Sequence, residues 1–561
     1  MVSYPLQMTT DDLNQARFHG LALSGGGFRA SFFHIGVLAR LAELDLLRTI
    51  QTISTVSGGS IIGASYYLKV KERMEGGHVQ RSDFIKIVNE LCTEFLAGAK
   101  KDLRSRTFAN FFANFRGTNS ERIGKLYEEY FYRGLAGQSG QVSMPDLRIQ
   151  PDDTAMEELR RKGLHEVPLL HINATLLGTG QRWTFTPQDM GALEDEPGVA
   201  KSSKGIATRL ARRFDYSELD GMADFPLGLA VAASACVPVI FPPVRLQLWP
   251  FDKVAITKEA TRLGQEPNKD EEHILNAAKK IHFELVDGGV VDNLGLGPLS
   301  ADKRALISNA SASSASSSLE LEGSSTATAV GRSIAVLLDK TQYAADLQAL
   351  ARLGSNDNMT QISLGQLTQL QEVAESPEIH ERMLDITEIR TDLDSFTDWE
   401  GNALMFAGYS CTKHALHERD VPSLDRKEEW PFDWVREYHE KRLIGRRLAG
   451  SSSHLKVIRL LPSGVQANKL GFGVIALFAF AYLVTLGSDQ AGVVGFVSNV
   501  LQFLLGMLLI GYVLAKLTIP LWLAMASWVE LLLRRPLLWL GRRPQSMQPS
   551  DRSRPRPDQP Q

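Results

Sequence analysis

Short aliphatic runs alternate with helix-like periods from about His19 onward, and glycine-rich turns separate them. Leu21–Leu23 resembles the end of a strand, and Ser24–Gly27 follows it directly. The next apolar residues recur at near-helical spacing (Phe33, Val37, Leu38, Leu41 and Leu44). Thr52–Val56 repeats the pattern, because small residues and a second helical period (Ile61, Ile62 and Tyr66) come after it. Such alternation predicts an α/β domain with a largely parallel sheet.

Further strands and two inserts are expected along the chain. The strands are Leu169–Thr175, His282–Val286, Ile334–Leu338 and Leu455–Leu460. Lys258–Lys280 is charged and helix-like, which indicates a surface excursion. Ser308–Thr328 is rich in Ser and Ala, and a segment with so little apolar content is expected to be a mobile loop or disordered. The residues after Gly541 are rich in Arg, Pro, Gln and Ser, and we expect a disordered tail there as well.

Hydrophobic residues are concentrated toward the C-terminal end. Leu470–Leu486 and Ala491–Ala515 are uncharged apolar runs, each long enough to cross or nearly cross a bilayer as a helix. A shorter run, Leu517–Val529, is interrupted by Pro520. A buried core helix is the alternative for any one run, but two runs in succession with basic flanks favour membrane insertion.

The basic residues predict an orientation for these runs. They lie before the first run and after the second (Arg446, Arg447, Lys456, Arg459 and Lys469; Lys516, Arg534, Arg535, Arg542 and Arg543). The turn Gly487–Ala491 has no positive charge, so a hairpin with both ends in the cytoplasm satisfies the positive-inside bias. Leu517–Leu533 either lies in the interface or forms a third span, and the hairpin is preferred because a third span would place the tail arginines on the far side. We therefore expect an integral membrane protein whose large domain faces the cytoplasm.

Charge and cysteine content are consistent with that placement. The formal net charge of -3 gives no reason to expect nucleic-acid binding, which usually needs a strongly basic face. Cys92, Cys236 and Cys411 are far apart in sequence and lack metal-ligand spacing, which favours a reducing compartment. The N-terminal residues lack the basic and apolar regions of a secretory signal peptide. No calcium-binding loop or zinc ligand cluster is evident, so we expect no metal and no cofactor.

Ser24–Ala30 is the first motif that indicates chemistry. Its three glycines, between a strand and a helix, let the backbone approach a bound group closely. Their N–H groups and the following helix N-terminus form an anion site, for a phosphate or for the oxyanion of an acyl intermediate. A nucleotide loop or a plain tight turn are alternatives. The glycine spacing and the absence of a following Lys-Ser/Thr pair argue against a nucleotide.

A serine turn and an aspartate turn complete the set. Ser57 follows a strand and is flanked by small residues, which is typical of a nucleophile whose hydroxyl is exposed above a sheet. Thr55 replaces the usual glycine of that pattern, and a helix N-cap is the alternative role for Ser57. Asp287 ends an apolar run and precedes two glycines, which places a carboxylate on a strand-end turn. Its alternative role is to bond its own backbone.

The order of these motifs resembles that of the patatin-like phospholipases. Ser24–Ala30 also resembles the loop of the related cytosolic phospholipase A2 group, and Val56–Ser60 is similar to its nucleophile turn. Val167–Gly180 resembles a strand and turn of the family, and Ala232–Pro243 resembles the helix end and proline turn that line its active site. The resemblance covers about 19–338 and weakens toward about 420. Thr55 and Ala30 depart from the family pattern, but neither position carries the reacting atoms.

The resemblance implies a three-layer α/β/α hydrolase domain and a serine lipid acyl hydrolase without a catalytic histidine. Ser57 would attack an ester carbonyl, and Asp287 would accept its proton. The implied oxyanion donors are Gly25, Gly26, Gly27 and Phe28, and the supporting residues are Arg29, Gly59, Gly288 and Gly289. The implied activity is that of a carboxylic ester hydrolase (phospholipase, lysophospholipase or lipase-type esterase), with phospholipid or another acyl lipid as substrate.

Several alternatives remain open from sequence. A Ser-His-Asp triad could use His171, His282 or His414, although none has a clear late-loop position. Transfer of the acyl group to an acceptor other than water uses the same serine chemistry, and a membrane-anchored scaffold with little turnover is a further possibility. A phenylalanine face at helical spacing either packs on the core or forms an interfacial helix (Phe108, Phe111, Phe112 and Phe115).

The expected domain organisation follows from these segments. Residues 1–17 form an N-terminal extension, and 18–460 form the catalytic domain with its two inserts. Residues 468–533 form the membrane-anchoring helices, and 534–561 form the basic tail.

Overall fold

The computed structural model describes residues 17–77, 80–109, 118–132, 141–149, 167–192, 213–218, 222–238, 240–246, 283–300, 303–311, 358–369, 385–417 and 428–435. Within these ranges ten strands form one sheet. Its five parallel strands lie in the order β10 (Met359–Ser363), β9 (Ala305–Asn309), β1 (Gly20–Leu23), β2 (Thr52–Val56) and β3 (Leu169–Leu176). Antiparallel strands continue from β3: β4 (Gln181–Phe185), β5 (Asp189–Ala192) and β6 (Arg213–Asp215) on one path, and β8 (Phe283–Asp287) and β7 (Val244–Leu246) on another.

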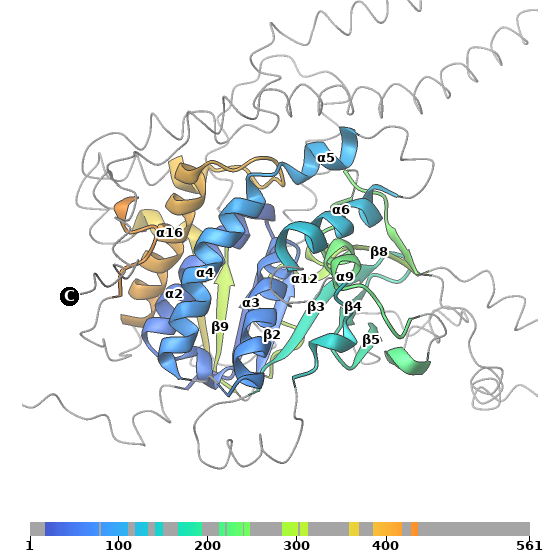
Figure 1. The fold of residues 1–561 in the computed structure, drawn as a ribbon, viewed down its shortest axis with the longest axis horizontal. Helices are drawn as coiled ribbons and strands as arrows, with labels where there is room; N and C mark the ends of the chain where they lie inside the picture. The colour runs from blue at the N-terminus through green and yellow to red at the C-terminus, as the bar shows by residue number, and fades with distance from the viewer. Residues whose placement is uncertain are drawn as a thin grey trace, which may run out of the picture.

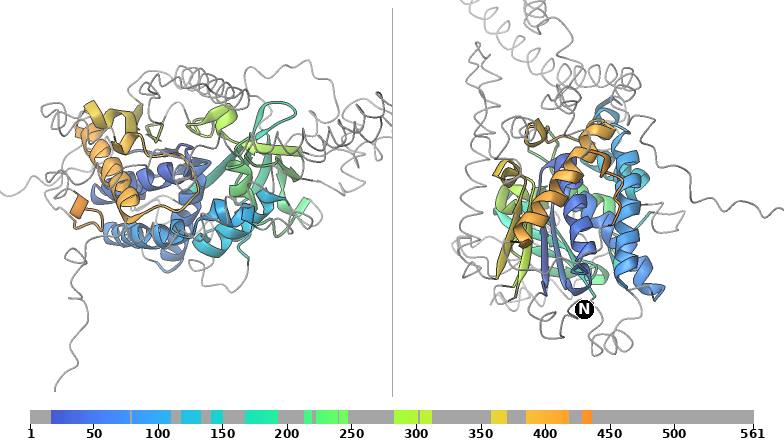
Figure 2. Two further views of the ribbon diagram at one scale, coloured as in Figure 1. Left: turned by 90° about the horizontal axis from the view of Figure 1, so that it is seen from above. Right: turned by 90° about the vertical axis from the view of Figure 1, so that its left-hand side faces the viewer.

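The long helices pack on one face of this sheet (Figures 1 and 2). Helices α2 (Gly27–Glu43), α3 (Gly58–Glu75) and α16 (Asp398–His417) contact the strands, and α4 (Arg81–Ala99) packs on α2 and α3 as an outer layer. Helices α2 and α3 connect β1 to β2 and β2 to β3, and successive right-handed crossovers in one direction along a sheet place their helices on the same face. The shorter helices are α5 (Leu103–Ala109), α6 (Asn119–Tyr127), α9 (Leu227–Ser234) and α12 (Gly289–Asp292). Single turns are η1 (Leu47–Thr49), η3 (Glu128–Tyr132), η4 (Pro145–Leu147), η5 (Tyr216–Glu218) and η7 (Leu364–Gln369).

The sequence therefore predicts the centre of the fold. The α/β class and the parallel order around β1–β3 are confirmed, and β8 is one residue displaced from the predicted 282–286. The antiparallel strands β4–β7 were not predicted, because they are short and carry polar residues that break the apolar pattern. Among the described residues the long helices cover one face, and a second long helical layer of the expected three-layer arrangement is not seen there.

One predicted boundary is wrong. The serine-rich insert was expected to begin at Ser308, but Ser308 and Asn309 end strand β9, and Ser308 is fully buried. The polar side chain is tolerated because its hydroxyl lies 2.6 Å from His34 Nδ1, and its carbonyl accepts the N–H of Ser24 at 3.1 Å. A composition-based prediction misses such a strand, because it cannot see the partners that satisfy the polar groups.

Helix α2 is buried almost all round, and not along one face as its spacing suggested. The cause is that α4 and α16 both pack on α2, with α16 on the side away from α3 (Figure 1). The two helices approach closely at Gly36 and Gly408. A Cβ on Gly36 would lie 1.9 Å from the carbonyl oxygen of Met405, and one on Gly408 would lie 2.0 Å from that of Phe33.

Other expectations fall outside the described residues. They are the strands 334–338 and 455–460, the insert 258–280, the rest of the insert after 311, the apolar runs 470–486 and 491–515, the run 517–533 and the tail. Within the described ranges, no helix has both the length and the apolar character that a membrane span requires. Cys92, Cys236 and Cys411 are buried and free.

The close crossing of α2 and α16 yields a stability prediction. We expect Gly36→Ala to destabilise the fold by about 1–3 kcal/mol, because the new Cβ meets backbone that cannot move aside. Helix propensity alone would predict the opposite sign. Gly178→Ala is the control, because nothing lies within 4 Å of its Cβ position. Urea midpoints that are equal for Gly36→Ala and wild type would contradict the proposed packing.

Candidate active site

Ser57 lies at the junction of β2 and α3. Its φ of 50° is a left-handed value that non-glycine residues seldom adopt, and strain of this kind gathers at functional turns. The helix N-cap role is not observed, because the Ser57 side chain makes no capping hydrogen bond. The turn depends on small neighbours: a Cβ on Gly59 would lie 2.2 Å from the carbonyl oxygen of Leu23. Ser57, which is 6% exposed, therefore has the backbone geometry of a nucleophile on a strand-end turn.

Strand β3 brings Asp287 next to this turn. Val56 of β2 pairs with Asn173 of β3, and the next residue of β3, Ala174, pairs with Asp287 of β8. The two strand ends are thus neighbours across β3, close enough that the Ser57 side chain lowers the pKa of the Asp287 carboxyl. The sequence prediction that these two residues lie together is consistent with this arrangement.

Burial sets the protonation behaviour of Asp287. The residue is 7% exposed, and burial raises the pKa of its carboxyl to about 6. The Gly289 N–H, which donates to Asp287 Oδ1 at 2.8 Å, and the Ser57 hydroxyl act in the opposite direction and limit that rise in pKa. A carboxylate with this pKa is a stronger base than an exposed one and is still mostly ionised at pH 7.

The glycine-rich loop lies beside the serine turn. A Cβ on Gly25 would come 3.3 Å from Ser57 Cβ, and one on Gly58 would come 2.0 Å from the carbonyl oxygen of Gly27. Gly26 and Gly27 have φ values of 132° and 56°, which glycine adopts without strain. The loop ends at the N-terminus of α2, where backbone N–H groups favour negative charge.

Two of the four predicted oxyanion donors are already engaged. The N–H of Gly25 donates to the carbonyl of Asn293 at 3.0 Å, and that of Phe28 donates to the carbonyl of Asp392 at 3.0 Å. Among the described residues, no hydrogen-bond acceptor is recorded for the N–H groups of Gly26 and Gly27. The four predicted donors therefore divide into two that bind the protein backbone and two whose N–H groups have no acceptor among the described residues.

Comparison with known proteins agrees with this geometry. Residues 21–300 match the Patatin family, described as patatin-like phospholipase. The chain belongs to the patatin-like phospholipase family. No curated protein sequence matches it.

Solved structures similar to this patatin-like chain have low identity. Human GIVD cytosolic phospholipase A2, in complex with methyl gamma-linolenyl fluorophosphonate inhibitor and terbium chloride, is 13% identical with a TM-score of 0.36 and 73% of this chain covered. The chain spans 61% of that protein's length. VipD from Legionella pneumophila is 14% identical with a TM-score of 0.30, and 95% of this chain and 93% of that chain are covered.

The departure of this patatin-like chain at Thr55 has a structural explanation. Thr55 accepts a hydrogen bond from the Ser60 hydroxyl at 2.9 Å and donates to the carbonyl of His171 at 2.9 Å. Its methyl group points at α3, where a Cβ on Gly63 would lie 2.6 Å from Thr55 Cγ2. The space that glycine usually provides two residues before the nucleophile is thus provided by Gly63, one turn into the helix.

Residues that sequence reasoning missed connect the two turns. Ser234, the last residue of α9, accepts the N–H of Ser57 at 2.9 Å with its hydroxyl and the N–H of Gly288 at 3.1 Å with its carbonyl. Two residues after Ser234, the carbonyl of Cys236 accepts the N–H of Asp287 at 2.9 Å. The stretch Ala232–Pro243 was associated with the active site by resemblance, but its pattern gives no signal for these bonds.

His34 is a second missed residue. It is fully buried in α2, and burial lowers the pKa of its imidazole to about 4, so the ring is neutral. The carbonyl of Ser24, 2.9 Å from Nε2, can only accept, so Nε2 carries the proton and Nδ1 accepts from the Ser308 hydroxyl. His34 therefore fixes the start of the glycine-rich loop to the end of β9.

The residues named as supporting make contacts with neighbouring backbone or with the Asp287 carboxylate. Arg29 Nη1 donates to the carbonyl of Ile389 at 3.3 Å, which agrees with a structural role for this side chain. A Cβ on Gly288 would lie 2.3 Å from the carbonyl oxygen of Asn173. Behind this turn, Asp292 accepts the N–H of Gly295 at 2.8 Å and forms a buried ion pair with Arg182 at 3.1 Å.

The other predicted features lie away from Ser57 or outside the described residues. His171 interacts electrostatically with Arg213 and Asp189, and His414 lies in the last turn of α16. Phe108 is buried and stacks on Phe241 with 5.4 Å between ring centroids, which supports core packing for the first residue of the phenylalanine face. His282 and the phenylalanines at 111, 112 and 115 are not among the described residues.

The Thr55–Gly63 pair yields a rescue prediction. We expect Gly63→Ala to displace the serine turn and slow the reaction of Ser57 with a fluorophosphonate by roughly ten- to a hundredfold, because small misplacements of reacting atoms are costly. Adding Thr55→Ser removes the opposing methyl and keeps the hydroxyl, so the double variant should regain most of the rate. A double variant as slow as Gly63→Ala would show that the methyl contact does not set the turn.

Proposed function

We propose that this chain is a serine lipid acyl hydrolase of the phospholipase, lysophospholipase or lipase type, in which Ser57 and Asp287 form a catalytic dyad. The observation that carries the proposal is their juxtaposition: a strand-end serine with strained backbone lies beside a buried carboxylate and interacts with it. A nucleophile bonded to a base of raised pKa is the arrangement that covalent acyl transfer needs. Membership of the patatin-like phospholipase family supports a lipid ester as substrate.

The proposed reaction has two halves. In the first, Ser57 Oγ attacks the ester carbonyl while its proton passes to Asp287, and the tetrahedral intermediate collapses as the alcohol leaves with that proton. In the second, Asp287 takes a proton from water, the hydroxide attacks the acyl-enzyme, and the fatty acid leaves as Ser57 regains its hydrogen. Each half passes through a tetrahedral intermediate, the first formed by attack of Ser57 and the second by attack of hydroxide. Each of these intermediates has negative charge on the former carbonyl oxygen, which would lie in the anion site at the start of α2.

The N–H groups of Gly26 and Gly27 are the proposed oxyanion donors. Gly25 and Phe28 support the loop, because their N–H groups are engaged by the carbonyls of Asn293 and Asp392. Loss of one preorganised donor typically costs roughly 10²–10³ in rate, so the identity of the donors matters.

Membrane attachment is part of the proposal and is supported by sequence. The uncharged runs Leu470–Leu486 and Ala491–Ala515 and their basic flanks favour a hairpin with the catalytic domain on the cytoplasmic side. An enzyme attached in this way would meet its insoluble substrate in the bilayer surface.

The activity test compares wild type with two dyad variants. Fatty-acid release from mixed phospholipid and neutral-lipid micelles should be abolished by Ser57→Ala and lowered by about 10²–10⁴-fold by Asp287→Asn, because the loss of a general base has that magnitude. Ser65→Ala, in the same helix with its hydroxyl on the carbonyl of Ile61, and the exposed Asp224→Asn are matched controls. A wild type that releases no fatty acid and does not react with a fluorophosphonate would contradict the proposal. Activity is expected to persist in a chelator.

The raised pKa of Asp287 sets a pH dependence. A base must be deprotonated, so kcat/KM should be half-maximal near the pKa of about 6, reach a plateau about one pH unit above it, and approach a tenfold fall per pH unit well below it. A profile that stays flat down to pH 4 would mean that Asp287 is not the base. The Ser65→Ala control should follow the wild-type curve.

A further measurement tests attachment. The full-length protein should remain in membranes after extraction at alkaline pH, and its basic tail should be open to protease only from the cytoplasmic side. Release of the chain into the alkaline supernatant would contradict the hairpin.

A further inference from the structure

We infer that residues 389–396, called here the strap, position the glycine-rich loop for catalysis and belong to the catalytic unit although they lie beyond the family match at 21–300. This inference rests on the proposed function, because it assigns a role in that same site. The strap precedes α16 in the chain and reaches the loop from a position far away in sequence.

The strap contacts the loop through its backbone. The carbonyl of Asp392 accepts the N–H of Phe28 at 3.0 Å, and the carbonyl of Ile389 accepts Nη1 of Arg29 at 3.3 Å. Gly27 lies against the strap without any side chain between them, because a Cβ there would be 2.9 Å from the carbonyl oxygen of Asp392 and 3.0 Å from its nitrogen. The ring of Phe28 also meets Phe396 edge-on, with 5.8 Å between centroids.

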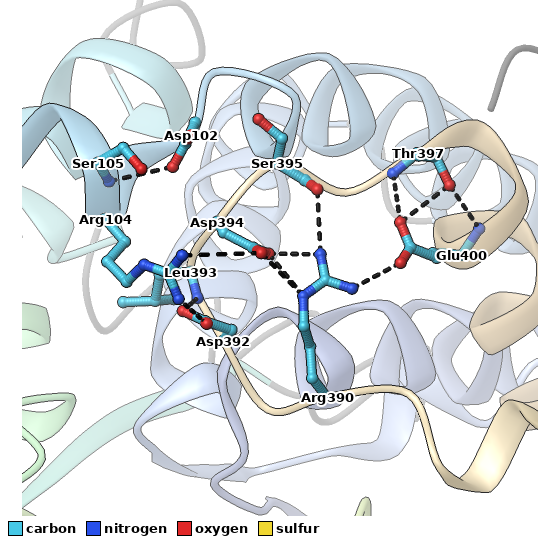
Figure 3. Close-up of polar contacts among 10 residues, drawn as sticks. All are labelled: Asp102, Arg104, Ser105, Arg390, Asp392, Leu393, Asp394, Ser395, Thr397 and Glu400. Atoms are coloured by element: carbon cyan, nitrogen blue, oxygen red, sulfur yellow. Dashed lines mark hydrogen bonds and ion pairs between the residues drawn. The ribbon is translucent and has the colours of Figure 1, made fainter. Parts of the chain in front are cut away.

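A buried ionic cluster fixes the strap (Figure 3). Arg390 binds Asp394 through Nε at 2.9 Å and Glu400 through Nη1 at 2.5 Å, and its Nη2 donates to the carbonyl of Ser395 at 3.1 Å. The side chains of Arg390 and Glu400 are fully buried. The guanidinium of Arg390 also lies over the ring of Phe396, 4.5 Å from its centroid.

A second arginine ties the strap to the neighbouring helix. Arg104 of α5 forms an ion pair with Asp392, lies 3.9 Å from Asp394, and donates its backbone N–H to the carbonyl of Leu393 at 3.0 Å. Arg390 before Asp392 and Leu393 and Asp394 after it are all held by these contacts. The Asp392 carbonyl, which accepts the Phe28 N–H, therefore has a fixed position.

The glycine-rich loop needs an external support because of its own composition. Three consecutive glycines have more conformational freedom than any other tripeptide, and oxyanion donors stabilise a transition state only when they are already oriented. Buried ion pairs are poor sources of net stability, because desolvation offsets most of their attraction. A buried cluster that abuts the loop is therefore better explained by the conformation that it specifies than by the stability that it adds.

The test compares two strap variants with a matched ion-pair variant. Asp392→Asn weakens the bond to Arg104 and keeps the side-chain oxygen that accepts the Leu393 N–H at 2.7 Å, and Arg390→Met removes the centre of the cluster. The control is Arg40→Met, which breaks the buried Arg40–Glu43 pair at the opposite end of α2, where Nη1 and Oε2 are 2.6 Å apart. Asp392→Asn is the milder change and keeps the test open if Arg390→Met does not fold.

We expect Asp392→Asn to lower kcat by about a hundredfold with KM changed by less than about threefold, since misplaced donors act on the transition state. Arg40→Met should keep the wild-type kcat at temperatures where it is folded, even if its melting temperature falls as much as that of Asp392→Asn. Equal kcat losses in Asp392→Asn and Arg40→Met would overturn the inference.

A second readout is independent of turnover. Amide hydrogen exchange of residues 25–30 should be faster in Asp392→Asn than in wild type and unchanged in Arg40→Met. Unchanged exchange in Asp392→Asn would overturn the strap's role even in an inactive protein, whereas an inactive wild type with the expected exchange pattern would count against the proposed function alone.

Discussion

The backbone contact between Gly27 and Gly58 is the constraint on which the site depends. The two residues begin the helices after neighbouring parallel strands, and the space between them has no room for a Cβ, which would lie 2.0 Å from the Gly27 carbonyl. Ser31 in the first turn of α2 strengthens the contact, because its hydroxyl donates to the carbonyl of Gly58 at 2.7 Å. The anion-binding loop and the nucleophile turn therefore contact each other directly through their backbones, with no side chain between Gly27 and Gly58.

This contact explains why the centre of the fold could be predicted from sequence. Glycines at the end of β1 and small residues at the end of β2 are local signals, and parallel strands connected by helices place such ends at one edge of a sheet. Ser57 and Asp287 could be named for the same reason, since each is the residue directly after or at the end of an apolar run. What local signals cannot give is the partner of each N–H group. Gly25 and Phe28 look like oxyanion donors in the sequence, and their long-range acceptors, Asn293 and Asp392, are visible only in three dimensions.

Polar residues account for most of the remaining differences. Ser308 was assigned to a loop from its composition, yet it ends a buried strand because His34 satisfies its hydroxyl. Ser234 carries no motif, yet it accepts hydrogen bonds from both catalytic turns. In each case a serine is expected to be exposed, but it is buried because a hydrogen bond across the core satisfies its hydroxyl.

Asp287 and Asp292 lie close together in the chain but have different electrostatic surroundings. Asp287 is buried beside a hydroxyl and a single backbone N–H, so the pKa of its carboxyl rises toward neutrality and the residue can exchange a proton. Asp292, only a few residues on, binds Arg182 and two backbone N–H groups, and these bonds fix the turn. Arg390 lies between Asp394 and Glu400, and these carboxylates raise the pKa of its guanidinium, whereas burial raises the pKa of Asp394 in the same strap to about 6. A carboxyl of the strap therefore titrates in the same range as Asp287, and the geometry of the glycine-rich loop requires α5, the strap and α16 to fold together with the family-matched residues.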